Sequence, residues 1–176
     1  GKLCDSSWLK SATLTEVQAE VDGGADVNAQ SKNGLTPLHQ APTVEIFRVL
    51  LSAGADINVR NEYGATPLHS ARTPEIIQAL LGAGANINAR DRGGATPLHK
   101  AYTPEIVRTL IEAGADINVR NEYGRTPLGM AFEPDVVFEK KPPEIIQLLI
   151  DAGATVNERD NYGLSLIHIS EPTRHS

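Results

Sequence analysis

Apolar residues recur along the chain in short groups with the spacing of one face of an α-helix. In the segment 74–83 the group consists of Ile76, Ile77, Leu80 and Leu81. Matching groups are Ile46, Phe47, Leu50 and Leu51, then Ile106, Val107, Leu110 and Ile111, then Ile145, Ile146, Leu149 and Ile150. Glu75 and Gln78 fall on the opposite face. The pattern predicts amphipathic helices that bury their apolar stripes against one another.

Between these helices, the chain carries the signals of a turn and of a second, shorter helix. Asn61 and Gly64 stand at the first and fourth positions of a predicted β-turn, where these residue types are favoured. Thr66 and Pro67 then mark a helix start, with Thr as the N-cap and Pro in the first turn. We expect this short helix to run from about Pro67 to about Arg72.

The longer helix begins with the same signal. Thr73 and Pro74 mark its start, and Glu75 favours the positive end of the helix dipole. We expect it to end at about Ala83, with Gly84 as a left-handed cap. Each unit is therefore a turn, a short helix and a longer helix.

The whole unit repeats at a fixed spacing of 30 residues. The string Thr-Pro-Leu-His stands at 36–39, 66–69 and 96–99, and Thr-Pro-Leu returns at 126–128. A fixed period of this length is typical of stacked units rather than of one globular core. We therefore predict a single all-α solenoid domain over residues 1–163. Its units are a degenerate first one at 3–30 and four repeats at 31–60, 61–90, 91–120 and 121–159.

These strings resemble the ankyrin repeat, whose signature contains Gly-x-Thr-Pro-Leu-His-x-Ala, Glu-Ile-Val-x-Leu-Leu and Gly-Ala-Asp-Ile-Asn. In this chain, residues 64–71 read Gly-Ala-Thr-Pro-Leu-His-Ser-Ala and residues 114–118 read Gly-Ala-Asp-Ile-Asn. The resemblance spans residues 11–163 and implies stacked antiparallel helix pairs with β-turn tips. Ankyrin repeats usually have about 33 residues, so this unit is three residues shorter, and the loss falls between His69 and Glu75.

The resemblance also implies where a partner binds. In the family, the turn tips and the exposed side of the short helices form the concave face, which recognises a polypeptide. Tyr and Arg are the side chains that most often anchor interfaces. The alternative is that Tyr at a turn tip packs on its neighbour. The candidate partner-binding residues are Tyr63, Arg72, Arg92, Lys100, Tyr102, Tyr123, Arg125, Phe132 and Phe138.

Two places depart from the regular pattern. In the first unit, Glu20 takes the place of Leu50, which suits a terminal repeat, and we expect Trp8 and Leu9 to seal this end. A binding site centred on Trp8 is the alternative. The fourth repeat has nine extra residues, 133–141. This insertion either packs its apolar residues on the adjacent helix or forms a ridge that contacts a partner.

The last residues have a different origin from the repeats. Residues 164–174 resemble the translation of an adapter used in preparing sequencing libraries, so we set 164–176 aside as a non-native tail. The resemblance suggests a metagenomic source and a natural gene that breaks off near Gly163. The last repeat then lacks a polar cap, and we expect a monomer or a weak end-to-end dimer.

Composition and charge argue against some classes of partner and favour others. The net charge of −6 argues against nucleic acid, which requires clustered Lys and Arg, and mildly favours basic partners. Cys4 is the only cysteine, so no internal disulfide forms. The apolar runs are too short to span a membrane. We expect a soluble chain in the cytoplasm by default, with secretion as an effector as the alternative.

The histidines are the only repeated residues that suggest chemistry. His39, His69 and His99 occupy equivalent positions, but packed helices lie about 8–10 Å apart, which is too far for a shared metal. In ankyrin repeats this histidine is a structural hydrogen-bonding residue. We find no sequence motif for hydrolysis, phosphate binding or dinucleotide binding. We therefore expect no catalytic residues, no cofactor and no metal.

Three functions remain to be compared. The first is a non-catalytic interaction module that binds a protein or peptide on its concave face. The second is a fragment of a larger effector or enzyme whose catalytic part is missing. The third, a hydrolase in its own right, has no residue in this sequence to support it.

Overall fold

A computed structural model describes residues 1–132, 142–157 and 159–162 of the chain. The elements in these ranges are helical. In chain order they are the 3₁₀ helix η1 (Lys2–Cys4) and the α-helices α1 (Ser6–Ser11), α2 (Leu14–Asp22), α3 (Pro37–Gln40), α4 (Val44–Ser52), α5 (Pro67–Ser70), α6 (Pro74–Gly82), α7 (Pro97–Lys100), α8 (Pro104–Glu112), α9 (Pro127–Phe132) and α10 (Pro143–Asp151).

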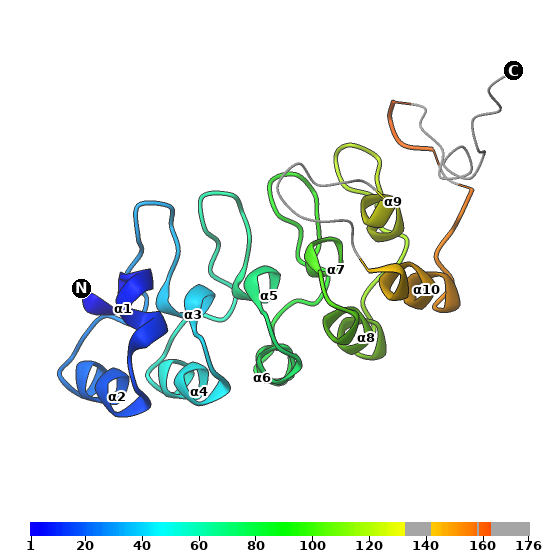
Figure 1. Cartoon of the computed structure of the whole chain (residues 1–176). Helices are drawn as coiled ribbons and strands as arrows, with labels where there is room; N and C mark the ends of the chain where they lie inside the picture. The colour runs from blue at the N-terminus through cyan, green and yellow to red at the C-terminus, as the bar shows by residue number, and fades with distance from the viewer. Residues whose placement is uncertain (133–141, 158, 163–176) are drawn as a thin grey trace, which may run out of the picture.

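The helices form two parallel rows in an elongated stack (Figure 1). The short helices α1, α3, α5, α7 and α9 make one row, and the longer α2, α4, α6, α8 and α10 make the other. Each helix packs against its equivalents in the neighbouring pairs. The loops that carry the turns project together beyond the row of short helices (Figure 1). The predicted all-α solenoid is therefore confirmed.

The short helices are shorter than the sequence pattern suggests. The helix that begins at Pro67 ends at Ser70 and not at Arg72. The reason is the second start signal. Thr73 precedes a proline, which disfavours helical backbone at that residue, and it takes an extended conformation with φ −136°. Arg72 therefore lies in an extended link between the two helices.

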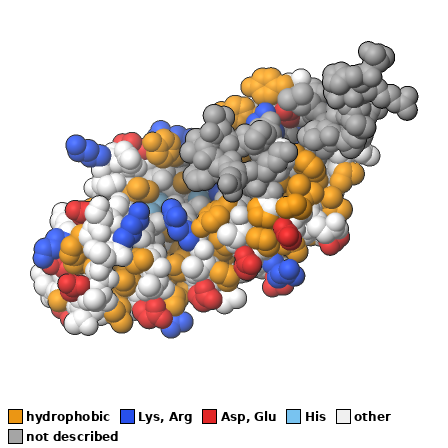
Figure 2. All heavy atoms as spheres, in the orientation of Figure 1, with side chains coloured by type: hydrophobic (Ala, Val, Ile, Leu, Met, Phe, Trp, Pro, Cys, Tyr) orange, Lys and Arg blue, Asp and Glu red, His pale blue; other side chains and the backbone are white. Residues whose placement is uncertain are grey.

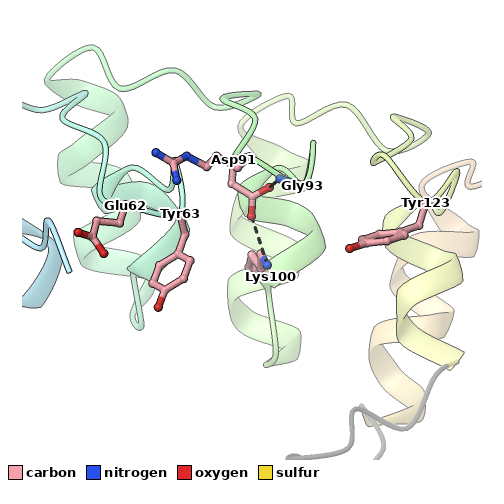
Figure 3. Close-up of a pocket in the computed structure, with 7 residues that line it drawn as sticks. Glu62, Tyr63, Asp91, Gly93, Lys100 and Tyr123 are labelled. Carbon is pink, nitrogen blue, oxygen red and sulfur yellow. Dashed lines mark hydrogen bonds and ion pairs between the residues drawn. The ribbon is translucent and has the colours of Figure 1, made fainter.

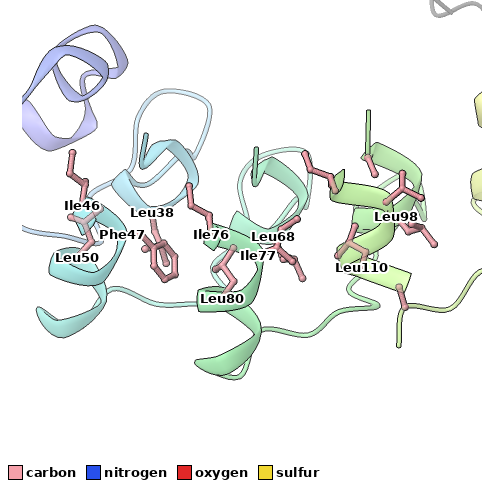
Figure 4. Close-up of a cluster of buried hydrophobic side chains, with 14 of the residues drawn as sticks. Leu38, Ile46, Phe47, Leu50, Leu68, Ile76, Ile77, Leu80, Leu98 and Leu110 are labelled. Atoms are coloured by element: carbon pink, nitrogen blue, oxygen red, sulfur yellow. The ribbon is translucent and has the colours of Figure 1, made fainter. Parts of the chain in front are cut away.

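The core lies between the two rows and runs the length of the stack (Figure 4). Phe47, Ile77 and Leu80 of the longer helices are at most 1% exposed. Leu68 of a short helix reaches the same layer from the opposite row. Full burial of each such side chain stabilises the fold by about 1.5–3 kcal/mol. The predicted apolar stripe is the buried face, and Gln78 on the opposite face is exposed.

Polar bonds between repeats fix their relative register. Asn side-chain oxygens accept hydrogen bonds from backbone N–H groups of the next repeat, with Asn28 bonded to Asp56, Asn58 to Asn86, Asn88 to Asp116 and Asn118 to Thr155. These bonds are 2.8–3.3 Å long. Each contributes about 1 kcal/mol or less. Their main effect is to tie neighbouring pairs at the ends of the longer helices.

The two ends of the stack differ. At the N-terminal end, Leu3 and Leu9 are fully buried, and Trp8 packs partly buried on the core. Lys2 Nζ lies 2.6 Å from a Glu20 carboxylate oxygen, which agrees with the expected terminal repeat, in which Glu20 takes the place of Leu50. At the other end, Ile150 and Val156 remain 39% and 42% exposed. Phe138, the rest of the 133–141 insertion and the 164–176 tail lie outside the described residues.

The burial pattern predicts the effect of truncating a core side chain. Leu80→Ala should lower the free energy of unfolding by about 2–5 kcal/mol, because Leu80 is fully buried and a cavity is left between repeats. Gln78→Ala on the exposed face of α6 should change it by less than about 0.5 kcal/mol. Urea denaturation followed by circular dichroism measures both. Equal losses would show that the buried face has been assigned wrongly.

Candidate protein-binding surface

The projecting loops are β-turns held by their own side chains. The N–H of Gly64 donates to the carbonyl of Asn61 at 2.9 Å, which closes the turn. Asn61 Oδ1 accepts from the N–H groups of Tyr63 and Ala65. Equivalent bonds form in the next two turns, around Asp91 and Asn121. The predicted turn chemistry at Asn61 and Gly64 is confirmed.

Backbone hydrogen bonds also join each turn tip to the next one. The bonds run from the N–H of Glu62 to Asn33, Arg92 to Tyr63, Glu122 to Gly93 and Asn161 to Tyr123, at 2.9–3.1 Å. In addition, a guanidinium nitrogen of Arg90 donates to the Arg120 carbonyl at 2.6 Å. The tips therefore form a continuous row in which the order and spacing of the side chains are set by the backbone.

One position in this row lacks the side chain that its neighbours carry. Tyr63 and Tyr123 stand at the tip position of their turns and are 65% and 52% exposed, whereas the turn between them has Gly93. An open groove of about 440 Å³ lies at this gap. Figure 3 shows Tyr63 and Tyr123 at its two ends, with Gly93 between them. The missing side chain accounts for the hollow.

Charged side chains line the floor of the groove. Lys100, at the end of α7, places Nζ 3.3 Å from Asp91 Oδ2 (Figure 3). Asp91 is held in place because its Oδ1 accepts from the N–H groups of Gly93 and Ala95. The pair leaves Lys100 half-exposed, with 46% of its side chain accessible. Glu62 and Arg92 also line the groove.

The structure brings together four of the predicted partner-binding residues. Tyr63, Arg92, Lys100 and Tyr123 line the groove. Arg72 and Tyr102 are exposed in the links that follow α5 and α7, outside the groove lining.

The remaining candidates lie elsewhere. Arg125 Nε lies 3.3 Å from Asp160 Oδ2, so its guanidinium ties the fourth turn to the segment after α10. Phe132 packs partly buried on the core. Phe138 lies outside the described residues. Asp91 is not among the predicted residues, although it is the one acidic residue among the equivalent turn positions 31, 61, 91 and 121.

The repeated histidines bond within the stack. His69 Nδ1 accepts from the Thr66 backbone N–H at 3.1 Å, so the ring proton lies on Nε2, which donates to the Ala95 carbonyl of the next repeat at 3.0 Å. His39 and His99 make the same bonds. Burial lowers the pKa of His39 and His69 below 6.5, although the carbonyl bonds oppose the shift. The predicted structural role is confirmed.

The described residues were also searched for clusters of metal-binding side chains and for membrane-spanning helices. In residues 1–132, 142–157 and 159–162, no three or more His, Cys, Asp or Glu side chains gather in a way that could hold a metal ion. The helices of these ranges are also too short or too polar to cross a bilayer.

The stacked helix pairs with projecting turns define a repeat solenoid. A family model described as Ankyrin repeats (3 copies) matches residues 10–91 and 72–160. The chain therefore belongs to the ankyrin repeat family, which is typically non-catalytic and whose repeats are generally protein–protein interaction modules. A search of curated proteins found no match.

Two adjacent glycines should respond differently to substitution. At Gly94, φ is +72° and an added Cβ would lie 3.1 Å from the backbone nitrogen of Glu122, so Gly94→Ala should destabilise the fold by about 1–3 kcal/mol. Gly93 lies outside the left-handed region, and its nearest neighbour would be Asp91 Oδ1 at 3.5 Å. Gly93→Ala should therefore be neutral or stabilise by up to about 1 kcal/mol. Thermal unfolding distinguishes the two, and a large loss at Gly93 would mean that the fold requires this glycine.

The lowered histidine pKa values predict a pH dependence of stability. The unfolded chain takes up protons at His39 and His69 as the pH falls through about 6.5, whereas the folded chain does so only at lower pH. The free energy of unfolding should therefore be highest above pH 6.5 and fall as the pH is lowered from about 7.5 to about 5.5.

The matched variant replaces both histidines with glutamine. Gln at this position of a capping box still accepts from the helix N-cap but does not titrate. His39→Gln combined with His69→Gln should give a flatter dependence of the unfolding free energy over the same pH range. An unchanged slope in urea titrations would assign the pH dependence to other groups.

Proposed function

We propose that residues 1–163 act as one non-catalytic interaction module that binds a protein or peptide on the concave face, centred on the groove at Gly93. The observation that carries the proposal is the gap between Tyr63 and Tyr123. It exposes two aromatic side chains and a hollow at the same point, and interface anchors are commonly aromatic residues beside well-packed pockets.

The rigidity of the turn tips supports the same conclusion. Binding is weakened when loops must be ordered as the partner arrives. Here the tips on both sides of the gap are already joined by backbone bonds, from Arg92 to Tyr63 and from Glu122 to Gly93. A partner would meet a surface that is formed in advance.

The distribution of charge distinguishes this face from the opposite side. Acidic side chains recur along the lower edge in Figure 2, where the longer helices lie. An acidic residue stands in the first turn of each longer helix, where the helix dipole stabilises it: Glu16, Glu45, Glu75, Glu105 and Glu144. Their position therefore has a structural explanation, whereas Tyr63 and Tyr123 stand on the turn tips and are 65% and 52% exposed.

Affinity capture with the full chain tests the proposal. A source lysate is passed over the immobilised protein, and bound proteins are identified by mass spectrometry. Tyr63→Ser combined with Tyr123→Ser should abolish capture, because each lost anchor costs about 2 kcal/mol or more of binding. The free energy of unfolding should change by less than about 0.5 kcal/mol.

The control replaces two exposed side chains of the longer helices. Arg48→Ser combined with Arg108→Ser should leave capture unchanged. Capture that survives loss of both tyrosines would contradict the proposal. Capture that is lost only when residues 133–141 are deleted would place the binding site on the insertion instead.

A further inference from the structure

Side chains of alternating charge stand beside the tyrosine position on successive turn tips. This alternating row consists of Lys32, Glu62, Arg92 and Glu122, each 30 residues after the last. All four residues are exposed. Within the described part of the chain, none of their charged groups makes an ion pair. The row therefore presents its charges in a fixed order to a partner.

The spacing of the row matches the repeat of a polyproline II segment. Neighbouring members are one repeat apart, and packed helices lie about 8–10 Å apart. A polyproline II segment advances about 9.3 Å in each three-residue turn, so its side chains at i, i+3 and i+6 share one face at the same interval. A β-strand, which has a period of two residues, places i and i+3 on opposite faces.

The groove beside the row suits the same conformation. Pro-rich segments in the polyproline II conformation bind grooves lined by aromatic side chains, because little conformational entropy is lost. Tyr63 and Tyr123 supply the aromatic rings, and the space at Gly93 leaves room for a pyrrolidine ring between them. The aromatic groove and the alternating row therefore favour the same partner.

We propose that the groove takes a Pro-rich polypeptide segment in the polyproline II conformation. Basic, acidic and basic residues of the segment, three positions apart, contact Glu62, Arg92 and Glu122. This inference rests on the proposed function and adds the chemistry of the partner. A shift by one repeat would place like charges together at every contact, so the row selects one register. The excess of basic residues in the segment also complements the net charge of −6.

Two peptides of identical composition test the inference. The first, Lys-Pro-Pro-Glu-Pro-Pro-Lys, has the complementary charge order in either chain direction. The second, Glu-Pro-Pro-Lys-Pro-Pro-Lys, has the same residues in an order that the row does not match. Fluorescence anisotropy with the full chain at low salt should give a Kd for the first peptide at least about tenfold lower than that for the second.

A charge exchange in the protein should reverse this preference. Glu62→Arg combined with Arg92→Glu keeps the net charge but changes the order of the row, which then complements the second peptide. The matched control, Arg108→Glu combined with Glu112→Arg, exchanges two exposed charges on α8 and should leave the preference unchanged. Gly93→Tyr should weaken binding of the first peptide to the otherwise unchanged chain by at least about tenfold, because a tyrosine side chain would fill the gap.

The possible results separate the two proposals. Equal Kd values for the two peptides, or a preference that the charge exchange does not reverse, would overturn the inference about partner chemistry. If capture from lysate still depends on Tyr63 and Tyr123 in that case, the proposed function stands with a partner of another class. If capture does not depend on them, the proposed function fails as well.

Discussion

Each helix pair of this chain can bury its apolar stripe only against the neighbouring pair. Leu80 of α6 has no exposed surface because α4 and α8 pack on either side of its helix. No single unit can gain this burial alone, so the fold exists only as a stack. The regular spacing of the turns, and thus the shape of any binding surface, depends on this packing between repeats.

Polar bonds give the stack its fixed register. His69 connects its own helix start to the carbonyl of Ala95 in the next repeat, and the Arg92 N–H connects adjacent turn tips. Because these bonds recur with the 30-residue period, a change at one surface position alters the surface without altering the fold. Gly93 is such a change. The proposed binding site is therefore a gap in an otherwise regular surface. The turn at this gap keeps its shape because its hydrogen bonds do not involve a side chain at position 93.

The sequence predicted much of this structure because its repeated signals are local. The stripe of α6 follows from helical periodicity, and its start follows from Thr73 and Pro74. The end of α5 at Ser70 was missed. Thr73 takes an extended backbone because it precedes a proline, and this extended segment begins earlier than the residue types suggest. Helix boundaries depend on such competition between neighbouring signals.

The groove was predicted less completely, because its geometry depends on contacts between distant residues. The positions of Tyr63 and Tyr123 at the tips of their turns indicated exposed aromatic side chains. The pairing of Lys100 with Asp91 was missed, since it requires the end of a helix to meet the preceding turn. Arg125 was assigned to partner binding without regard to Asp160, which follows the nine-residue insertion and is shifted from the 30-residue register.

The most direct test of the central claim is a map of amide chemical shifts, recorded by NMR on the full chain as the captured partner is added. If the gap at Gly93 is the centre of recognition, the largest shifts will fall in the turns 61–64, 91–94 and 121–124 and at the end of α7. Shifts confined to the exposed faces of α4, α6 and α8 would contradict the account.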